Sequence, residues 1–553
     1  MRRHLVYRAR ASLFARVRAS VRVLQYSFVL ALSVFCPAWG ASPSGEPVGT
    51  FNVVGVSIAE LAHAQGQGRV TSLQLVDLYL ARIAQLDRAG PSLHSVLALN
   101  PNARADARAL DRERSAGHAR GPLHGIPLLI KDNIETADPM PTTAGSLALV
   151  DNMGRRDAPL IARLRAAGAV ILGKTNLSEW ASMRSAVSVS GWSAVGGQTL
   201  NPYALDRSPC GSSSGSGAAV AASLAAAAVG TETDGSITCP ASLNGVVGIK
   251  PTVGLVSRTH VVPLSHSQDT PGPITHTVAD AALLLGVMAG TDPQDPATAA
   301  ADAHKWNASD AFAPADLKGV RVGVIRISSA LPQVKELLNS AIGRLTEAGV
   351  TVVEVDAPSG DAQLGDQEET VLLTELKADL ATYLATTPAQ VKVRTLGDLI
   401  HFNREHAARE MPIFGQDLFE QAELTTGLQD PVYLKAREDS KLAAGRDGLD
   451  KLLVSHQLQA IIAPTMGPAY LIDTIAGDTI SSSGPGGFPA IAGYPHLTLP
   501  MGMVKGLPVG LSLIGTAWTD RSLLALGASV ERVLGPVPGP KYIANTARAG
   551  AAR

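Results

Sequence analysis

The sequence predicts a mixed α/β fold in which helices cover a central β-sheet. Short apolar runs, typical of buried strands, alternate along the chain with segments that have the periodicity of amphipathic helices. The 553 residues are 46% hydrophobic and only 17% charged. That balance supplies a large core and is unlike the composition of a disordered chain.

Helical periodicity recurs from the first third of the chain to its end. In the segment 71–87, Val76, Tyr79 and Ile83 share an apolar face, and Thr71 or Ser72 can cap the N-terminus. The segment 218–229 is nearly all Ala, Leu and Val, which predicts a buried helix. We expect helices at residues 57–65, 71–87, 102–116, 160–167, 218–229, 278–288, 333–348 and 520–533, and a mostly helical stretch at 364–453.

The strands are expected between these helices, where apolar runs are short. They lie at residues 95–99, 123–130, 169–173, within 244–255, and at 319–327, 350–355, 460–464, 495–501 and 509–513. Residues 291–317 are rich in Asp, Ala and Pro, which predicts a linker or a long surface loop. Residues 484–487 predict a flexible Gly/Pro loop.

The first 40 residues have the features of a signal peptide. Seven arginines and no acidic residue lie in 2–22, an apolar run follows at 24–35, and Ala38-Trp39-Gly40 predicts cleavage before Ala41. The apolar run is well short of the ~20 residues that a spanning helix needs, so no stable membrane anchor is expected. We therefore expect a signal peptide at 1–40, a single domain at 41–553, and a periplasmic or secreted protein.

Composition excludes several classes of function. The 47 basic and 48 acidic residues nearly cancel, so nothing marks a nucleic-acid-binding surface. The 13 histidines and three cysteines lack metal-ligand spacing and a CxxC pair, so we expect neither a metal nor a redox cofactor. Cys36 would be removed with the leader. Free buried thiols are the favoured interpretation of Cys210 and Cys239, and a disulfide between them stays open.

The stretch 207–239 carries the first candidates for chemistry. It holds two Gly/Ser loops, and glycine lets a ligand approach backbone N–H groups closely. Serine hydroxyls beside such donors suit attack on a carbonyl with an oxyanion hole. Ser213 lies at the centre of a G-x-S-x-G pattern, although the residues before it are typical of a loop rather than a strand. Ser236, after Gly235, is the alternative nucleophile.

Lys131 is the candidate base. It ends the apolar run 123–130, and desolvation there favours a neutral amine that can accept a proton. The alternative is a lysine that reaches the surface or pairs with Asp132. His124, Asp132 and Asp234 either assist the site or serve loop packing and turns.

Six motifs in order resemble the amidase signature family. They lie at residues 125–133, 173–180, 211–216, 230–237, 245–252 and 506–511. The resemblance runs from about residue 58 to the last helix and is weakest at 300–455, so the conserved core of the domain would be about 57–300 and 456–536. It implies a mixed central sheet covered on both faces by helices, and hydrolysis of amides without a metal or cofactor.

The resemblance also implies the roles of single residues. The family's Ser–cisSer–Lys unit falls on Ser236 as nucleophile, Ser212 as the bridging serine with a cis peptide bond, and Lys131 as base. Ser212 has the family's separation from Ser236, whereas Ser213 and Ser214 do not. The oxyanion donors fall on the N–H groups of Thr233, Asp234, Gly235 and Ser236.

Two departures from the family pattern bear on the substrate. Asp234 stands where the family usually has Gly, and Thr238 stands where it usually has an Arg able to recognise a carboxylate. With Ser-Pro-Cys-Gly before the serines and an export leader, they resemble the bacterial peptide amidase branch, which implies C-terminal peptide amides as substrates. The alternatives are a general aliphatic or aryl amidase, a Ser-His-Asp hydrolase that uses Ser213, a chain like the A component of glutamyl-tRNA amidotransferase, and a non-catalytic binding protein. No obligate protein partner is expected.

Overall fold

The computed structural model describes residues 51–308, 312–358 and 360–546, all within the unit Phe51–Arg553. The expected signal peptide, its cleavage site before Ala41 and Cys36 lie outside the described residues. Among the helices of the described ranges, none combines the length and apolar character that crossing a bilayer requires.

Within the described residues, eleven strands form one mixed sheet in the order β1-β3-β2-β6-β8-β7-β12-β13-β11-β9-β10. This arrangement confirms the predicted fold class. The strands β3, β2 and β6 are parallel neighbours, and antiparallel pairs continue the sheet through β13 and β11. The strands are β1 Val96–Leu99, β2 Pro127–Lys131, β3 Val170–Thr175, β6 Ala227–Glu232, β7 Val247–Lys250, β8 Thr270–Thr275, β9 Arg321–Val324, β10 Thr351–Glu354, β11 Ala460–Pro464, β12 His496–Val504 and β13 Leu507–Ile514, with a separate hairpin of β4 Trp192–Ser193 and β5 Gly197–Gln198.

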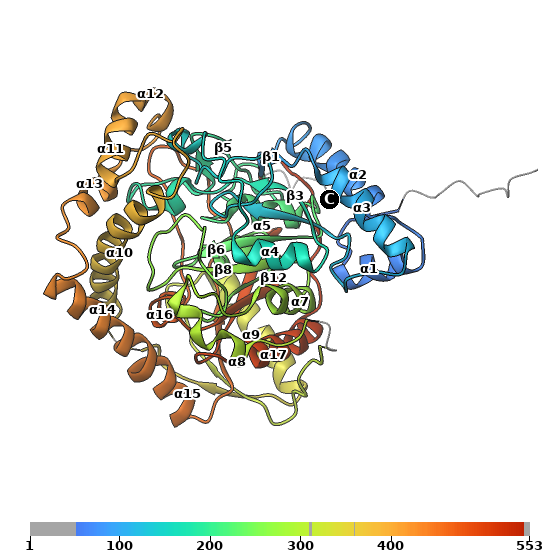
Figure 1. Cartoon of the computed structure of the whole chain (residues 1–553). Coiled ribbons are helices and arrows are strands. Elements are labelled where there is room, and N and C mark those ends of the chain that lie inside the picture. The colour runs from blue at the N-terminus through green and yellow to red at the C-terminus, as the bar shows by residue number, and fades with distance from the viewer. Residues whose placement is uncertain (1–50, 309–311, 359, 547–553) are drawn as a thin grey trace, which may run out of the picture. The chain divides into compact units, whose positions relative to one another are not determined.

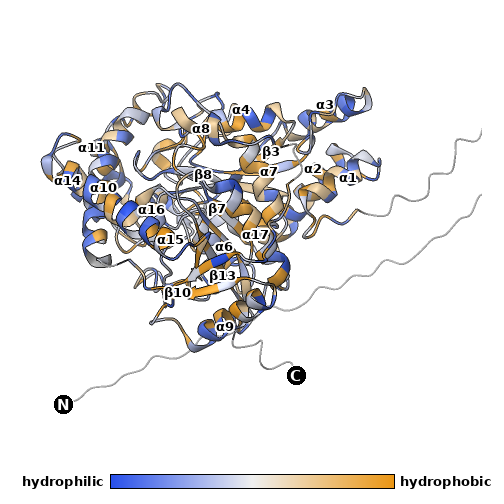
Figure 2. Cartoon of the chain, turned by 90° about the horizontal axis from the view of Figure 1, so that it is seen from below, coloured by the Kyte–Doolittle hydropathy of each residue, from blue (hydrophilic) through white to orange (hydrophobic). Residues whose placement is uncertain are grey.

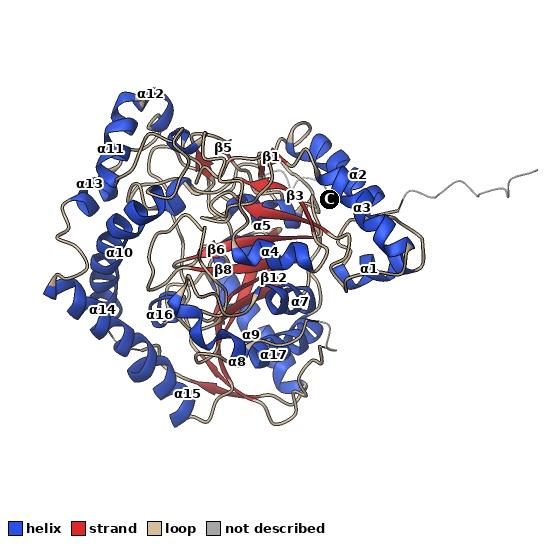
Figure 3. Cartoon of the chain, in the orientation of Figure 1, coloured by secondary structure: helices blue, strands red, loops and turns tan. Residues whose placement is uncertain are grey.

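Helices pack around this sheet (Figures 1 and 3). One group of helices consists of α4, α7, α17 and α9, which contact one another in that order. Of this group, α7, α17 and α9 contact the sheet. A second pair, α5 and α6, contact each other and pack on different strands of the sheet. The helices are α1 Ile58–Gly66, α2 Ser72–Arg82, α3 Ala103–Ser115, α4 Pro159–Ala166, α5 Ser214–Ala221, α6 Thr238–Leu243, α7 Val278–Met288, α8 Ala301–His304, α9 Pro332–Glu347, α10 Asp361–Leu384, α11 Leu396–Glu405, α12 Ala407–Glu410, α13 Asp417–Glu423, α14 Pro431–Ala444, α15 Lys451–Ser455, α16 Gly487–Ala492 and α17 Asp520–Leu534.

Local sequence explains where many helices begin. Thr71 caps α2 by accepting a hydrogen bond from the N–H of Gln74, whose side chain accepts one from the backbone N–H of Thr71.

The helical region α10–α15 forms its own group beside the sheet, on the left in Figure 1. Figure 2 shows hydrophobic colour along β13 and hydrophilic colour on α3 and α11, as expected for core and outer elements.

The prediction of one buried helix over 218–229 is wrong. The chain ends α5 at Ala221, turns, and enters β6 at Ala227. β6 lies in the interior of the sheet between β2 and β8, and every residue in it is buried. A strand buried on both faces is apolar at each position, so periodicity cannot distinguish it from a buried helix.

Three further segments differ from expectation or add to it. β8 was not predicted, because Pro271 and Pro273 argue against a strand. Its pairing with β7 is confined to Ile274 and Thr275, so the prolines lie beyond that ladder. The expected linker at 291–317 carries α8 and a buried Trp306 that packs into the core. The expected Gly/Pro loop at 484–487 leads directly into α16.

Candidate active site

The candidate site forms where parallel strands end at one edge of the sheet. Lys131 is the last residue of β2, and it pairs in register with Thr175 at the end of β3. On the other side, Ile130 pairs with Val229 of β6, so that Thr231 follows beside Lys131. Parallel topology therefore brings the lysine to the strand that leads into Ser236.

Lys131 contacts one of the candidate serines directly. Its Nζ lies 2.7 Å from Oγ of Ser212, 2.8 Å from Oγ1 of Thr231 and 3.2 Å from the carbonyl oxygen of Thr231. Ser212 is 1% exposed and follows a cis peptide bond from Gly211. The cis bond implied by the family resemblance is thus present at the expected position.

Burial changes the chemistry of this lysine. Lys131 is fully buried, and loss of hydration lowers its pKa to about 7, although the charges of Asp269 and Glu232 act in the opposite direction. An amine with this pKa is substantially uncharged at neutral pH and can accept a proton. The predicted alternative, in which Lys131 reaches the surface or pairs with Asp132, does not occur.

Asp132 has a different partner. Its carboxylate lies 2.9 Å from Nζ of Lys174, and both side chains are buried. A third buried lysine, Lys250, has its Nζ 3.2 Å from the carbonyl oxygen of Pro251. His124 is also buried, and its Nε2 contacts the carbonyl oxygen of Leu110 at 2.8 Å. Of these side chains, only that of Lys131 is hydrogen bonded to a candidate serine.

The loop before α6 holds Ser236 close to the cis peptide. The N–H of Ser213 donates to the carbonyl oxygen of Ser236 at 3.0 Å, which joins the two serine loops. Gly235 has a φ of 75°, a conformation that favours glycine and shapes the turn before Ser236. Ser236 is 8% exposed, more than Ser212 and Ser213. A nucleophile needs this access to substrate, whereas a proton relay does not.

Ser213 has a structural contact instead of access. It is 0% exposed, and its hydroxyl donates to the carbonyl oxygen of Thr231 at 3.0 Å. The residues before it form a loop that leads into α5, not the strand of a nucleophile elbow. The geometry therefore disfavours the G-x-S-x-G interpretation.

Glu232 and Thr238 support the serine loop and were not predicted to do so. The carboxylate of Glu232 accepts hydrogen bonds from the N–H groups of Ile237 and Thr238 at 2.6 and 2.8 Å. The hydroxyl of Thr238 also donates to Glu232, at 3.2 Å. Thr238 thus serves the loop backbone at the position where the family usually carries an arginine. The one feature of the sequence that could have indicated this role is the carboxylate of Glu232 at the end of an apolar run.

Asp269, the residue that precedes β8, contacts the same loop. Its carboxylate accepts a hydrogen bond of 2.6 Å from the hydroxyl of Thr233 and others from the N–H groups of Leu264 and Ser265. Burial raises the pKa of Asp269 to about 6. Because Asp269 lies in a segment that the sequence left unassigned, no local pattern could have found it.

Cys210 and Cys239 form a disulfide, so the favoured prediction of free thiols is wrong. Their Cα atoms are 5.9 Å apart, within the normal range for a disulfide. The convergence of the two serine loops explains this proximity: Cys210 precedes the cis peptide, and Cys239 lies in the first turn of α6. Residues 29 positions apart in sequence thus become neighbours at the candidate site.

A charged cluster elsewhere has the residue types of a metal site. The nitrogen and oxygen atoms of His266, Glu375 and Asp379 lie within 4.8 Å of one another. Nδ1 of His266 is 2.9 Å from Asp379, and Nε2 is 3.1 Å from Glu375. The hydrogen bond to Asp379 raises the pKa of His266, with the charge of Glu375 acting in the same direction. With a carboxylate at each ring nitrogen, this cluster is an ion-paired contact between α10 and the 258–269 loop.

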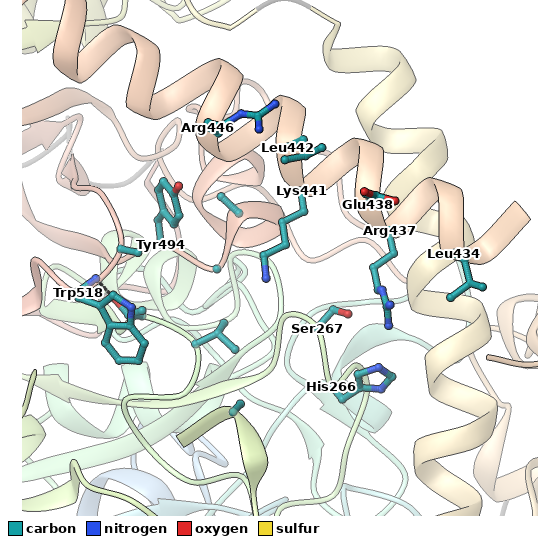
Figure 4. A pocket seen from close by; sticks show the side chains of 16 residues that line it. His266, Ser267, Leu434, Arg437, Glu438, Lys441, Leu442, Arg446, Tyr494 and Trp518 are labelled. Carbon is teal, nitrogen blue, oxygen red and sulfur yellow. Dashed lines mark hydrogen bonds between the residues drawn. The ribbon is translucent and has the colours of Figure 1, made fainter. Parts of the chain in front are cut away.

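Two cavities of the described residues differ in their relation to the candidate site. One of about 270 Å³ is lined by Gly211 and Gly235, which precede Ser212 and Ser236. Another of about 940 Å³ lies against α14 and is lined by none of the candidate catalytic residues. In Figure 4, Arg437 extends from α14 toward His266 on the wall of this larger cavity. The smaller cavity is therefore the one adjacent to the serine loops.

Comparisons with known proteins identify the family. The family model Amidase matches residues 74–524. The chain is 39% identical over 503 residues to a protein described as a probable amidase from Arabidopsis thaliana, covering 90% of this chain and 93% of the relative. It is 36% identical to the A component of the glutamyl-tRNA(Gln) amidotransferase of Roseiflexus castenholzii, covering 86% of this chain and 96% of that relative.

A solved structure is also similar over nearly its full length. The native peptide amidase from Stenotrophomonas maltophilia superimposes with a TM-score of 0.83 at 48% identity, covering 88% of this chain and 98% of that chain. The chain belongs to the amidase signature family. It is an amide-hydrolysing enzyme whose fold matches that of a peptide amidase.

Proposed function

We propose that the enzyme hydrolyses amides through Ser236, Ser212 and Lys131, and that C-terminal amides of peptides are its substrates. The observation that carries the catalytic assignment is the 2.7 Å contact between Nζ of buried Lys131 and Oγ of Ser212. It places a group able to accept a proton beside a serine whose loop is hydrogen bonded to that of Ser236.

The reaction begins with two proton transfers. Neutral Lys131 accepts the proton of Ser212, and Ser212 accepts the proton of Ser236, whose Oγ attacks the amide carbon. The N–H groups at 233–236 stabilise the negative charge that develops on the carbonyl oxygen. The proton returns through Ser212 to the nitrogen, the C–N bond breaks, and ammonia or an amine leaves an acyl-Ser236 ester. Water then attacks this ester by the same relay, giving a carboxylic acid and free Ser236.

Two observations support a peptide amide as substrate. The similar solved structure is that of a peptide amidase, at 48% identity. Thr238 presents no cation to a substrate carboxylate, because its side chain is uncharged, and its hydroxyl and N–H both donate to Glu232. A neutral chain end therefore suits this position better than a free carboxylate.

The similarity to the A component of glutamyl-tRNA(Gln) amidotransferases supports a second candidate function, amide hydrolysis that supplies ammonia to a transamidation complex. Such a component would work with partner chains. Release of ammonia from peptide amides by the purified chain alone favours the first function. Activity that appears only with co-purified partners and glutamine favours the second.

The decisive experiment compares two serine variants on a panel of peptide amides, aliphatic amides and anilides. We expect Ser236→Ala to lower kcat by at least about 1,000-fold, because nucleophile and relay act as one unit. Ser213→Ala should retain measurable turnover, since it loses only two structural hydrogen bonds, to the carbonyl oxygen and from the N–H of Thr231. Near wild-type turnover in Ser236→Ala, or its abolition only in Ser213→Ala, would disprove the assignment.

We also propose that the enzyme is exported to the periplasm or secreted. The basic and apolar leader of residues 1–40 supports export. The disulfide between Cys210 and Cys239 supports it independently, because disulfides persist mainly in oxidising compartments.

A further inference from the structure

The cavity of about 270 Å³ beside the serine loops has an uneven distribution of charge. Apart from the serine loops, its lining comes mainly from the C-terminal segment between Thr465 and His496. The lining includes the carboxylates of Asp234 and Asp478 and contains no lysine or arginine. A group entering this space therefore meets carboxylates and no cation in the lining.

Asp478 is fixed in this lining by Ser190. One carboxylate oxygen accepts a hydrogen bond of 3.1 Å from the N–H of Ser190, and the other accepts one of 2.5 Å from its hydroxyl. The hydroxyl of Tyr470 is also hydrogen bonded to this carboxylate. A carboxylate offers about four acceptor positions, so these three contacts still leave capacity for a ligand. Asp478 is thus held in place while still able to accept further hydrogen bonds.

His496 adds an acceptor of a different kind. It is 2% exposed and begins β12, and its Nε2 lies 2.6 Å from Oγ of Ser512. The hydroxyl of Ser512 donates to Thr465, so it accepts from Nε2–H, and this leaves Nδ1 unprotonated. Burial, with a smaller contribution from the charge of Lys250, lowers the pKa of His496 to about 3, so the ring is neutral.

His496 lines the cavity, and its unprotonated nitrogen, Nδ1, has no hydrogen-bond partner among the described residues, although it is buried. The Cε1–Nδ1 edge of the ring lies near Gly486, another residue of the lining, where a Cβ would stand 3.5 Å from Cε1 and 3.9 Å from Nδ1. A buried acceptor without a partner is unfavourable unless a ligand or water supplies a donor. The position of Nδ1 therefore points to an N–H or O–H group that enters from the cavity.

We propose that this cavity is a binding subsite for the substrate group next to the scissile amide, and that it selects neutral or cationic groups bearing N–H donors over carboxylates. His496 accepts one hydrogen bond, and Asp478 supplies acceptor capacity and negative charge. The inference rests on the proposed amide hydrolysis and adds to it the chemical class that the enzyme prefers.

The first test varies substrate charge. N-acylated amides of lysine, glutamine and glutamate are compared by ammonia release with the wild type, Asp478→Asn and Asp473→Asn. Asp473 is the matched control, because it lies on the same segment outside the lining, where one of its oxygens accepts from the N–H groups of Ile475 and Ala476. The wild type should prefer the lysine amide to the glutamate amide in kcat/KM by at least about tenfold.

Asp478→Asn should reduce this lysine-to-glutamate ratio by about threefold or more, while Asp473→Asn leaves it unchanged. Asparagine keeps an oxygen that can accept from the N–H of Ser190, so a loss of charge is separated from a loss of structure. An equal ratio in all three enzymes, or a wild-type preference for the glutamate amide, would overturn the proposal.

The second test removes the acceptor of His496. His496→Gln retains a polar group near Nε2 but lacks the acceptor at Nδ1, whereas His496→Asn places an oxygen where Nδ1 lies. The preference for a glutamine amide over the isosteric methionine amide should fall about fivefold in His496→Gln and be partly restored in His496→Asn. Equal loss in both variants would show a purely structural role and count against the subsite.

A binding measurement separates this inference from the proposed mechanism. The variant Ser236→Ala is titrated calorimetrically with the same lysine, glutamine and glutamate amides. We expect the lysine amide to bind most tightly, and we expect the added change Asp478→Asn to weaken its binding. This result would support the subsite even if the turnover experiments assigned catalysis to other residues. Indistinguishable affinities would overturn the subsite and leave amide hydrolysis intact.

Discussion

Lys131 illustrates how burial serves chemistry at the scale of one residue. At the end of β2 it is surrounded by protein, and its Nζ donates hydrogen bonds to oxygens of Ser212 and Thr231. The carboxylates of Asp269 and Glu232 limit the fall in its pKa without reversing it. The residue is therefore poised to exchange a proton near neutral pH.

The pH dependence of kcat/KM follows from this pKa. Because only the neutral amine accepts a proton, activity should fall about tenfold per pH unit below the folded pKa of about 7. Lys131→Arg should be inactive at every pH, since a guanidinium keeps its proton. Steady-state kinetics from pH 4.5 to 9 check both expectations. A flat profile in acid would exclude Lys131 as the base.

Stability should also fall as the pH falls, but over a higher pH range than activity. The folded pKa of about 7 lies below the usual 10.5, so folding is penalised below pH 10.5 and the full penalty is present below pH 7. Each pKa unit corresponds to about 1.4 kcal/mol. After loss of its hydrogen bonds, Lys131→Met should still raise the free energy of unfolding at pH 7 by about 2 kcal/mol. Urea denaturation measures this, and the gain should shrink toward pH 10; a less stable variant at pH 7 contradicts it.

Residues of the site differ in how far sequence could predict them. Local pattern favoured Ser213, and only the spacing of a family motif moved the nucleophile to Ser236. The structure gives a physical reason to prefer Ser236: the hydroxyl of Ser213 is buried and donates a hydrogen bond to the carbonyl oxygen of Thr231. Asp269 was beyond prediction, because its contact with Thr233 joins segments that no sequence periodicity relates.

At the scale of elements, the disulfide links the two loops that carry the serines. We expect Cys210→Ala to lower the free energy of unfolding by about 2–4 kcal/mol, because it releases a constraint on the unfolded chain. Cys239→Ala should have the same effect, and the double variant should add little. Urea denaturation with and without reductant provides the measurement. Additive single effects, or insensitivity of the wild type to reductant, would contradict the bond.

Most elements could be predicted from apolar periodicity, and the exceptions are informative. The run 218–229, predicted as one helix, contains the end of a helix and a strand. The prediction failed because complete burial removes the alternation that distinguishes a strand from a helix. β8 was missed because its prolines oppose strand formation, while its pairing with β6 and β7 decides the outcome. Both cases lie in the interior of the sheet, where tertiary contacts outweigh local preference.

At the scale of the whole molecule, the resemblance gave a mixed sheet covered by helices, and the structure has this architecture. The order of eleven strands within the described residues depends on pairings far apart in sequence, such as β7 with β12. Such pairings follow from topology rather than from local pattern. For the region α10–α15, the sequence predicted that residues 364–453 are mostly helical, but it did not predict how these helices pack.

Export is the prediction that belongs to the intact chain. When the full-length protein is produced in a bacterial host, mature enzyme should appear outside the cytoplasm with Ala41 at its N-terminus. Amino-terminal sequencing of fractionated protein checks this. A chain lacking residues 1–40 serves as the control and should remain in the cytoplasm. Uncleaved, cytoplasmic full-length protein would contradict the proposal.

The disulfide also has a mechanical consequence. Cys210 and Cys239 are separated by 29 positions and enclose α5, β6 and both candidate serines in a covalent ring. When the two ends of the chain are pulled apart, this ring cannot be extended. At roughly 3.5 Å per residue, reduction would release about 100 Å of additional contour length. In a force spectroscopy experiment, the catalytic segment would thus behave as a link whose length is set by oxidation.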